Sequence, residues 1–392
     1  MSPRVRVQKF GGTSVSTPER REMVVEQVRR ARDAGYAVAI VVSAMGRRGD
    51  PYATDTLLDL LRADGGAVAP GDYTLAFVTG EIISVALMSH TLKRAGIPAV
   101  GLTGAQARIF TDGHPTEAEV IQVDASRLLD LLGRGEVPVI TGGQGIVSDT
   151  FDYNTLGRGA SDTSGVVVGV ALGAERVEIF TDVEGVATAD PRIVPTARTI
   201  DRIGFARMHE LARFGAKVVH ARAVKAGWDG ATPVVVRSTF SDAPGTWIGN
   251  TDGGEPRFSG VASLAPFHTV TVPAGSVDQA TLGAWERRRL IMSLLDARSG
   301  RVVLGAPDAR ELEAALAEAG LEPSQRAEQA WVSVIGDAAA LRAGADDDLA
   351  ALAAAGVHTR FHGGGDLRRT YVVDPSPAAV AVRLLHDRWA GA

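Results

Sequence analysis

Four continuous apolar runs constrain the fold of this chain most strongly. They are AVAIVVSAMG (37–46), VPVITGGQGI (137–146), VEIFTDVEGV (177–186) and TPVVVRS (232–238). Runs that are apolar on both faces suit central strands of a mostly parallel sheet with helices on both sides. Helical patterns separate the runs, at Pro18–Ala34, Asp55–Arg62, Ile82–Ala95, Ala125–Gly133, Ser161–Leu172 and Phe205–Ala226. Residues 1–242 are therefore predicted to form an α/β sandwich.

Composition narrows the class of protein. The 392 residues exceed one typical core, and the net charge of −5 argues against nucleic acid as a partner. The chain has no cysteine and no HExxH spacing, which excludes disulfides and makes a structural metal site unexpected. We find no signal-like N-terminus and no apolar run of the roughly 18 residues that a membrane span needs. We therefore expect a cytoplasmic protein without a membrane partner.

The segment FSDAPGTWIGNTDGGEPR is rich in glycine, proline and aspartate, as linkers are. We place a linker at 243–258 and two small α+β units after it, at 259–335 and 336–392, whose elements can interleave.

The opening strand ends in a lysine that runs into a glycine turn. Val5 and Val7 alternate with polar residues, Lys9 follows, and Gly11 and Gly12 let the backbone turn and let a ligand approach it closely. Strand, cation, glycine turn and helix start can hold a phosphate. A glycine turn in an ordinary α/β unit explains the same stretch equally well.

Three other charged clusters follow the predicted strands or begin predicted helices. Glu81 is expected to open a helix. A glutamate at a helix N-terminus is stabilised by the helix dipole in any case, so this position does not by itself indicate a function. Arg158 lies between two glycines, which leave its guanidinium room for a planar anion. Ser161 and Asp162 follow and are expected to cap a helix. In the third cluster, Thr181 and Asp182 are expected at a strand end, Arg192 in a turn and Lys217 at the start of a helix.

Eight segments, in order across roughly residues 5–247, resemble the aspartokinase family within the amino-acid kinase fold. They are VQKFGGTSV, VVSAMG, GDPYATD, VTGE, LGRGASDT, TDVEGVATADPR, GAKVVHARAV and RSTFSDAPGT. The resemblance implies an amino-acid kinase sandwich followed by two ACT-like (ferredoxin-like) units. It also implies ATP-dependent phosphorylation of the side-chain carboxylate of L-aspartate to 4-phospho-L-aspartate, in lysine and threonine biosynthesis.

The resemblance assigns a role to each candidate residue. Lys9 contacts the transferring phosphate and Asp162 orients it, while Gly11 and Gly12 shape the phosphate loop. Residues implied at the amino-acid substrate are Ser43, Glu81 for the ammonium, Arg158 for the α-carboxylate, and Ser161. Residues implied at the nucleotide are Thr181, Asp182, Arg192 and Lys217. Mg2+ would be carried on the ATP phosphates without a protein-built site.

The chain also departs from the family pattern. Gly143 replaces an aromatic residue, Ala160 a glycine, Ala187 a tyrosine and Ala221 a proline, and Arg108 stands where the family has glycine. These changes are expected to reshape the amino-acid pocket and loosen the adenine side. The turns expected to bind an effector, VPAGSVDQATL and IGDAAALRAG, lack the family pattern, which puts ordinary lysine or threonine feedback in question.

Two alternatives stay open. The chain could be a kinase of this lineage with a different amino acid or aspartate-like acceptor, or a non-catalytic ATP-binding regulatory subunit. In each case we expect a homodimer formed through the ACT-like units.

Overall fold

The computed structural model describes residues 4–251, 254–273, 275–287, 292–296, 299–323 and 325–391. Contacts divide the chain into two compact units. Unit 1 comprises Met1–Val186, Asp201–Phe205 and Val218–Thr251, and unit 2 comprises Ala187–Ile200, Ala206–Lys217 and Asp252–Ala392. The boundary expected after residue 242 thus lies inside unit 1, and two short segments before it belong to unit 2.

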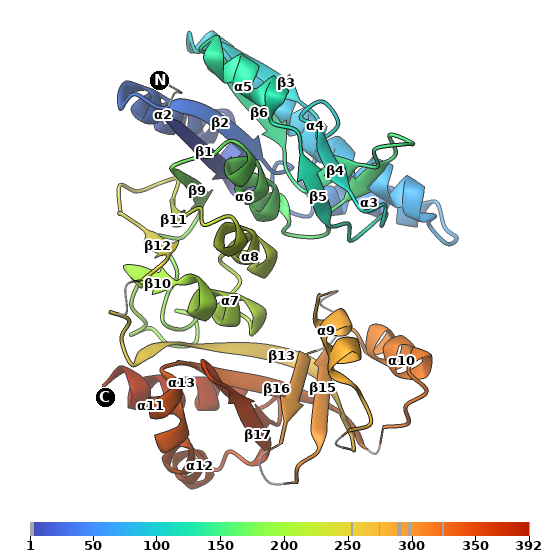
Figure 1. Ribbon diagram of the computed structural model, residues 1–392, viewed down its shortest axis with the longest axis vertical. Helices are drawn as coiled ribbons and strands as arrows, with labels where there is room; N and C mark the ends of the chain where they lie inside the picture. The colour runs from blue at the N-terminus through green and yellow to red at the C-terminus, as the bar shows by residue number, and fades with distance from the viewer. Residues whose placement is uncertain are drawn as a thin grey trace. The chain divides into compact units, whose positions relative to one another are not determined.

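Unit 1 contains the sheet that the apolar runs predict. Its strand order is β10-β12-β11-β9-β1-β2-β6-β3. Every pair in it is parallel except β11 with β12 (Figure 1). The predicted mostly parallel α/β sheet is therefore confirmed. The strand bounds are β1 Val5–Phe10, β2 Ala37–Val42, β3 Ala99–Leu102, β6 Val137–Thr141, β9 Arg176–Thr181, β10 Arg202–Gly204, β11 Val234–Ser238 and β12 Thr246–Gly249.

Helices cover both faces of this sheet. On one face, α2 and α4 pack Val28, Met88 and Leu92 into a core with Phe10 and Phe180, whose rings stack 4.7 Å apart. On the other face, α6 contacts β1, β2 and β9. The helix bounds in unit 1 are α1 Gly12–Val15, α2 Pro18–Asp33, α3 Thr54–Ala63, α4 Pro70–Arg94, α5 Ser126–Gly133, α6 Ser161–Ala171 and α8 Ala221–Asp229.

A second, four-stranded sheet divides one of the predicted strands. Its order is β5-β4-β7-β8. The run 137–146 forms β6 in the large sheet and β7 in the small one, because the chain bends at Gly143, whose φ of +68° suits glycine. The strand bounds are β4 Ile109–Thr111, β5 Val120–Val123, β7 Gln144–Ile146 and β8 Tyr153–Thr155.

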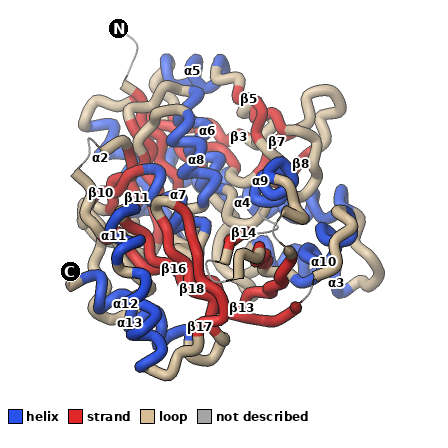
Figure 2. Tube along the Cα trace, turned by 60° about the horizontal axis from the view of Figure 1, so that its bottom comes forward, coloured by secondary structure: helices blue, strands red, loops and turns tan. Residues whose placement is uncertain are grey.

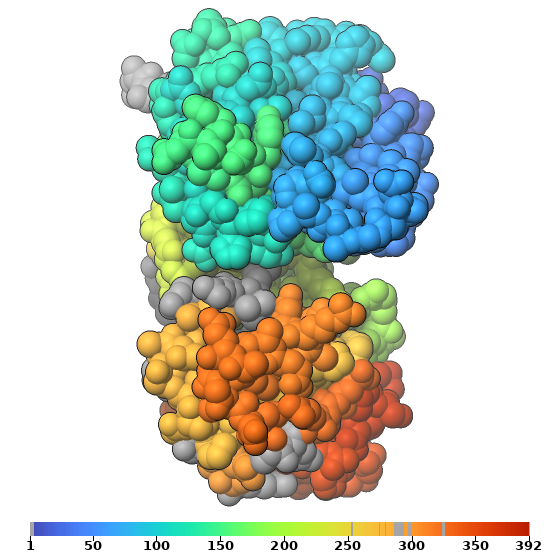
Figure 3. Space-filling view, turned by 90° about the vertical axis from the view of Figure 1, so that its right-hand side faces the viewer, coloured from blue at the N-terminus to red at the C-terminus, as the bar shows by residue number. Residues whose placement is uncertain are grey.

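Helix α4 differs from its prediction in two ways. It begins at Pro70, so Glu81 lies in its middle and does not open a helix. It is also long and apolar enough to cross a membrane, so the expectation that no run reaches that length was wrong. However, 56% of its most apolar window is buried in the protein, as in a core helix. Figure 3 shows the surface of the α3–α4 segment, light blue to cyan, on one face of unit 1.

Unit 2 is built on one six-stranded antiparallel sheet, β14-β15-β13-β16-β18-β17 (Figure 2). The strand bounds are β13 Phe258–Val272, β14 Met292–Leu295, β15 Val302–Ala306, β16 Gln325–Gly336, β17 Thr359–Gly365 and β18 Arg368–Val373. The helix bounds are α9 Gln279–Arg287, α10 Ala309–Glu318, α11 Ala338–Ala343, α12 Ala345–Ala354 and α13 Ala378–Ala390. Two separate hydrophobic clusters pack on this sheet, one around Trp285 and one around Trp389.

Several expected boundaries fall differently in this region. The predicted helix 205–226 is two helices, α7 Phe205–Arg213 and α8, so Lys217 lies between them and does not begin a helix. Within the expected linker, residues 252–253 lie outside the described residues, and β13 begins at its last residue, Phe258. Ala274 of the first effector turn also lies outside them. In the second turn, Asp337 caps α11.

A buried aspartate ties the helices of the Trp389 cluster to the sheet. Asp348 of α12 is 1% exposed. Its Oδ2 accepts a hydrogen bond from the Tyr371 hydroxyl at 2.7 Å, and its Oδ1 accepts from Arg388 Nε at 3.1 Å. The Trp389 indole N–H lies 3.1 Å from both oxygens. The carboxylate therefore has a donor from the sheet and two from α13, which satisfies its charge without water.

Replacing Asp348 with alanine should destabilise unit 2 strongly. The change leaves the buried Tyr371 hydroxyl and Trp389 indole N–H without their acceptor, and each unsatisfied buried donor costs about 1–3 kcal/mol. Urea unfolding of Asp348→Ala, compared with wild type, measures the difference. The neighbouring Asp347→Ala is the control, because the Asp347 side chain is 78% exposed and lies 3.8 Å from Arg388. Equal stability of the two variants would contradict a structural role for Asp348.

Candidate functional site

Lys9 is held by a buried ion pair at the carboxyl end of β1. Its Nζ lies 2.7 Å from Oδ1 of Asp162, and the side chains are 9% and 10% exposed. Oδ2 of Asp162 accepts the backbone N–H of His220 at 3.1 Å, which fixes the carboxylate. Asp162 lies in the first turn of α6, so helix and strand together position the lysine ammonium. The expectation that Ser161 and Asp162 cap this helix was wrong, because the N-cap is Ala160 and no side chain caps it.

The loops after β1 and β2 meet backbone to backbone. A Cβ on Gly12 would lie 2.4 Å from the carbonyl oxygen of Ala44, so only glycine fits there. The amide of Gly46 donates to the Gly12 carbonyl at 3.2 Å, and the amide of Gly11 donates to Phe180 at 3.2 Å. This close approach requires the glycine turn that the sequence predicts. The hydrogen bond from Gly11 to Phe180 connects the turn to β9 as well.

Ser43 and Ser161 connect this loop pair to α6. The Ser43 hydroxyl donates to the Ser161 hydroxyl at 2.8 Å. The contact brings together two residues that are far apart in the sequence and that were both expected at a substrate.

A cavity of about 450 Å³ opens beside these loops. Residues from the ends of β1, β2 and β9 contribute to it, as expected for a ligand site in an open α/β sheet. Thr181 donates to Asp182 at 3.2 Å, and Asp182 also pairs with Arg47 at 2.9 Å. The lining residues are Thr13, Ser16, Arg20, Gly46, Arg47, Asp50, Asp182 and Phe240.

Glu81 is a buried carboxyl group with an unused oxygen. The residue is 5% exposed, and its Oε2 has no hydrogen-bond partner among the described residues. Burial raises the pKa of Glu81 to about 8, and the backbone amides of Glu81 and Ala44 oppose the rise. The Ala44 amide belongs to the loop after β2, so Glu81 lies next to the phosphate-loop region. Among the described residues, no cationic side chain forms an ion pair with Glu81.

Arg158 is paired within the protein. Its Nη1 lies 2.6 Å from Oδ1 of Asp55, and the two side chains are 55% and 28% exposed. The guanidinium holds the pKa of the Asp55 carboxyl below its usual range. The expected open guanidinium is therefore not observed, because Arg158 is paired with Asp55 of α3. An anionic ligand would have to displace Asp55 to bind Arg158.

Arg192 and Lys217 belong to unit 2. Arg192 forms a 2.6 Å ion pair with Asp190 in the expected turn. That pair is the main cause of a lowered pKa at Asp190, to which Lys217 also contributes.

Four of the residues that depart from the family pattern have the following surroundings. At Gly143 a Cβ would lie 3.7 Å from the ring of Phe77, so an aromatic residue already borders this position. Arg108, with a φ of 57°, pairs with Asp124 at 2.6 Å beside the β4–β5 hairpin. Ala160 is buried ahead of α6, and Ala187 forms a β-bridge with Thr199.

Sequence reasoning missed three polar residues of this region. Asp55, Arg47 and Asp50 all lie in the charged stretch GRRGDPYATD that follows an apolar run, and this pattern could have pointed to them. Within the described ranges, no group of three or more histidines and acidic residues is placed to hold a metal ion.

Comparison with known proteins places this geometry in a family. The model of the amino acid kinase family matches residues 4–238. The chain is 40% identical over 278 residues to aspartokinase 1 of Bacillus subtilis, with 69% of each chain covered. It is 44% identical over 242 residues to an aspartokinase of Mycolicibacterium smegmatis, covering 62% of this chain and 56% of that one.

Solved structures agree on the fold. Aspartokinase III of E. coli, in complex with aspartate and ADP, aligns with a TM-score of 0.83 at 24% identity and covers 98% of this chain and 99% of that one. The aspartate kinase of Synechocystis aligns with a TM-score of 0.56 at 30% identity, covering 98% of this chain and 69% of that one. The chain therefore belongs to the amino acid kinase family and, within it, to the aspartokinases.

Proposed function

We propose that this chain phosphorylates the side-chain carboxylate of L-aspartate with ATP, giving 4-phospho-L-aspartate. The observation that carries the proposal is Glu81, a buried carboxyl with an unpartnered oxygen next to a loop that contacts the Lys9 turn. A cation site beside a phosphate-type loop suits a substrate that has both an ammonium and an acceptor carboxylate. The comparisons favour neither a different acceptor nor a regulatory subunit.

The phosphate half of the site rests on charge and close approach. In our proposal Lys9 stabilises the negative charge on the transferring phosphoryl group, and Asp162 keeps the lysine in place. Gly11 and Gly12 have no side chain, so they would let the phosphates approach the backbone. The carbonyl oxygen of Ala44 already approaches Gly12 closely in this way. Asp182 lines the cavity on the proposed nucleotide side, and the Thr181 hydroxyl donates to it.

The amino-acid half rests on two opposite charges. Glu81 would receive the substrate ammonium and Arg158 its α-carboxylate, with Ser43 and Ser161 at the acceptor end. Arg158 would exchange the Asp55 carboxylate for that of the substrate, because both are planar groups that a guanidinium binds with two hydrogen bonds.

The metal would arrive with the nucleotide. Mg2+ keeps several waters and prefers one or two carboxylates plus phosphate oxygens, and Asp50 and Asp182 line the cavity as carboxylates of that kind. Arg192 and Lys217 remain proposed nucleotide contacts. A homodimer formed through two ACT-like units at 259–335 and 336–392, weakened lysine or threonine feedback, and a cytoplasmic location also remain proposals.

Hydroxylamine trapping tests the function directly. The purified chain with MgATP and L-aspartate should form a hydroxamate, because hydroxylamine attacks an acyl phosphate and releases phosphate. Arg158→Ala should raise the KM for aspartate at least tenfold, since charge-assisted hydrogen bonds contribute about 1.5–3 kcal/mol each. Arg62→Ala, which removes a 49% exposed arginine from α3, is the control. If hydroxamate forms only with another amino acid, the acceptor is wrong, and if none forms with any amino acid, the kinase proposal fails.

The role of Lys9 can be separated from its role in packing. Lys9→Met should lower kcat by at least about 10²-fold, as loss of a charge-stabilising group does. It also leaves Asp162 buried without its cation, which by itself should lower the thermal stability. The double variant Lys9→Met with Asp162→Asn should regain stability but not activity. Recovery of both together would mean that Lys9 acts only structurally.

Aspartate binding should release a proton from Glu81. With a pKa near 8, the carboxyl is mostly protonated at pH 7 in the free protein, and the substrate ammonium favours its ionised form. Calorimetric titrations in two buffers of different ionisation enthalpy should therefore show close to one proton released at pH 7, and aspartate affinity should rise as the pH rises towards 8. Glu81→Gln should bind aspartate more weakly and without proton release.

The same shift has a consequence for stability. A carboxyl whose folded pKa is raised loses stability as the pH rises from its ordinary value near 4.5 to about 8, because only the unfolded chain ionises there. Glu81→Gln should therefore gain stability relative to wild type over this range in urea unfolding. A pH-independent difference between the two proteins would contradict the buried, protonated carboxyl.

A further inference from the structure

A row of arginines crosses the face of the large sheet that Lys9 does not use. In the parallel register Arg6 is paired with Arg176, Gln8 with Glu178, and Glu178 with Val235 of β11. Side chains that are paired across neighbouring strands share a face, and residues one position apart point to opposite faces. Lys9 points to the face covered by α6, where a Cβ added to Gly165 would lie 3.0 Å from the Lys9 Cβ. Arg6, Gln8 and the arginines beside them therefore lie on the other face.

One buried glutamate serves three guanidinium groups here. Glu178 is 2% exposed. Its Oε1 accepts hydrogen bonds from Arg176 at 3.2 and 2.8 Å, and its Oε2 accepts from Gln8 at 3.0 Å. Nη1 of Arg6 and Nη1 of Arg237 each lie 3.8 Å from the same Oε1, too far for a hydrogen bond. Arg176 therefore takes most of the hydrogen-bonding capacity of Oε1, and Arg6 and Arg237 have only the longer 3.8 Å ion-pair contacts with it.

Arg237 has an unused donor on this face, as Arg6 also does. Its Nε is excluded from solvent and has no hydrogen-bond partner among the described residues. Its guanidinium lies 5.6 Å from the centre of the Phe180 ring, an attractive contact that provides no acceptor. Asp242 is drawn instead to Arg30, with which it pairs at 2.5 Å. A buried guanidinium donor without an acceptor is unfavourable, so an arriving oxyanion would find a prepared partner.

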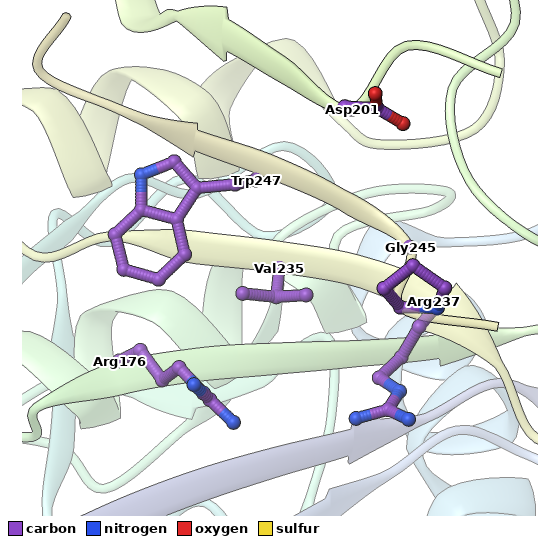
Figure 4. A pocket seen from close by; sticks show the side chains of 7 residues that line it. Arg176, Asp201, Val235, Arg237, Gly245 and Trp247 are labelled. Carbon is purple, nitrogen blue, oxygen red and sulfur yellow. The ribbon is translucent and has the colours of Figure 1, made fainter. Parts of the chain in front are cut away.

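A cavity of about 270 Å³ is lined by Arg176 and Arg237. Figure 4 shows the side chains of Arg176, Val235 and Trp247 on neighbouring strands, with Arg237 at the other end of the pocket. Asp201 is the one acidic residue among the residues that line this cavity, and in Figure 4 it lies at the far side from both guanidinium groups. The lining residues are Arg176, Asp201, Val235, Arg237, Pro244, Gly245 and Trp247.

This cavity is separate from the proposed kinase site. It shares no lining residue with the cavity of about 450 Å³ that includes Thr13 and Asp182, and none with the proposed aspartate or nucleotide contacts. Arg176 begins β9, whereas Thr181, on the nucleotide side, ends it. The two cavities therefore differ in their lining residues, although Arg237 pairs with Phe180, next to Thr181.

We propose that this cavity is a binding site for a small oxyanion, a carboxylate or phosphate group held by Arg176 and Arg237. Nε and Nη2 of Arg176 already donate to Glu178, so an arriving oxyanion would meet the Arg237 guanidinium and the remaining Nη1 of Arg176. Val235, Pro244 and Trp247 form an apolar wall that accepts a short carbon skeleton attached to that group. The volume admits a ligand of metabolite size, and the two arginines in the lining favour an anion over a cation. The proposal is independent of which acceptor the kinase site uses.

Titration with inorganic phosphate and with malonate, at constant ionic strength in potassium chloride, tests the site on the full chain. Calorimetry gives the affinity, and tryptophan emission reports the location, since Trp247 lines the cavity and Trp247→Phe removes that one of the five tryptophans. Arg237→Gln should weaken binding at least tenfold, and Arg237→Lys should weaken it in part because the fork is lost. Arg134→Gln is the matched control, an arginine 54% exposed and paired with Asp130 and Glu136.

Two further variants keep the outcome decisive. Phosphate can also bind at a kinase site, so Lys9→Met should leave the tryptophan-reported binding unchanged. Val235→Phe fills the cavity without removing a charge and should abolish binding even if Arg237→Gln fails to fold. Tighter binding of phosphate or of malonate identifies which oxyanion the site prefers. Absence of binding by both probes, equal affinity in Arg237→Gln and Arg134→Gln, or loss of binding only in Lys9→Met would overturn the proposal.

Discussion

The buried pair of Lys9 and Asp162 is the interaction on which the site depends. An ammonium 9% exposed needs a close carboxylate, and α6 supplies it from its first turn while the His220 amide holds the second oxygen. Because the lysine ends a central strand, its position is set by the sheet and not by a mobile loop. The glycine contacts among the loops after β1, β2 and β9 then bring the remaining groups to the same edge.

Charge that is unsatisfied in the ligand-free protein marks where ligands are expected. Glu81 lies inside a helix that otherwise packs as core, and its raised pKa reflects the free energy of burying a carboxyl group without a cation. On the opposite face of the sheet, the arginines around Glu178 show the reverse imbalance, with more guanidinium groups than carboxylates. By contrast, Asp348 in unit 2 has donors on both oxygens, which is the pattern of a structural residue.

Much of the fold was predictable because its determinants are local. Apolar runs such as 37–46 and 177–186 mark β2 and β9, and Thr17 with Pro18 marks the start of α2, where the Thr17 side chain accepts from the Arg20 amide. The extent of α4 was missed because Gly80 and Thr79 suggested a loop. A Cβ on Gly80 would lie 2.9 Å from the Ala44 Cβ, so this close packing favours a glycine inside the helix. The break before Lys217 was missed because alternating apolar residues continue across both α7 and α8.

The sequence by itself determined the family, the parallel sheet and the identity of the charged groups, because strand runs, glycine turns and motif order are properties of short segments. Only the tertiary structure decided which charges meet. It paired Arg158 with Asp55 and Asp182 with Arg47, left Glu81 without a cation, and gathered three arginines around Glu178. These outcomes depend on burial and on distances between residues far apart in the chain, and the free energy of a charge is set by those quantities rather than by its neighbours in sequence.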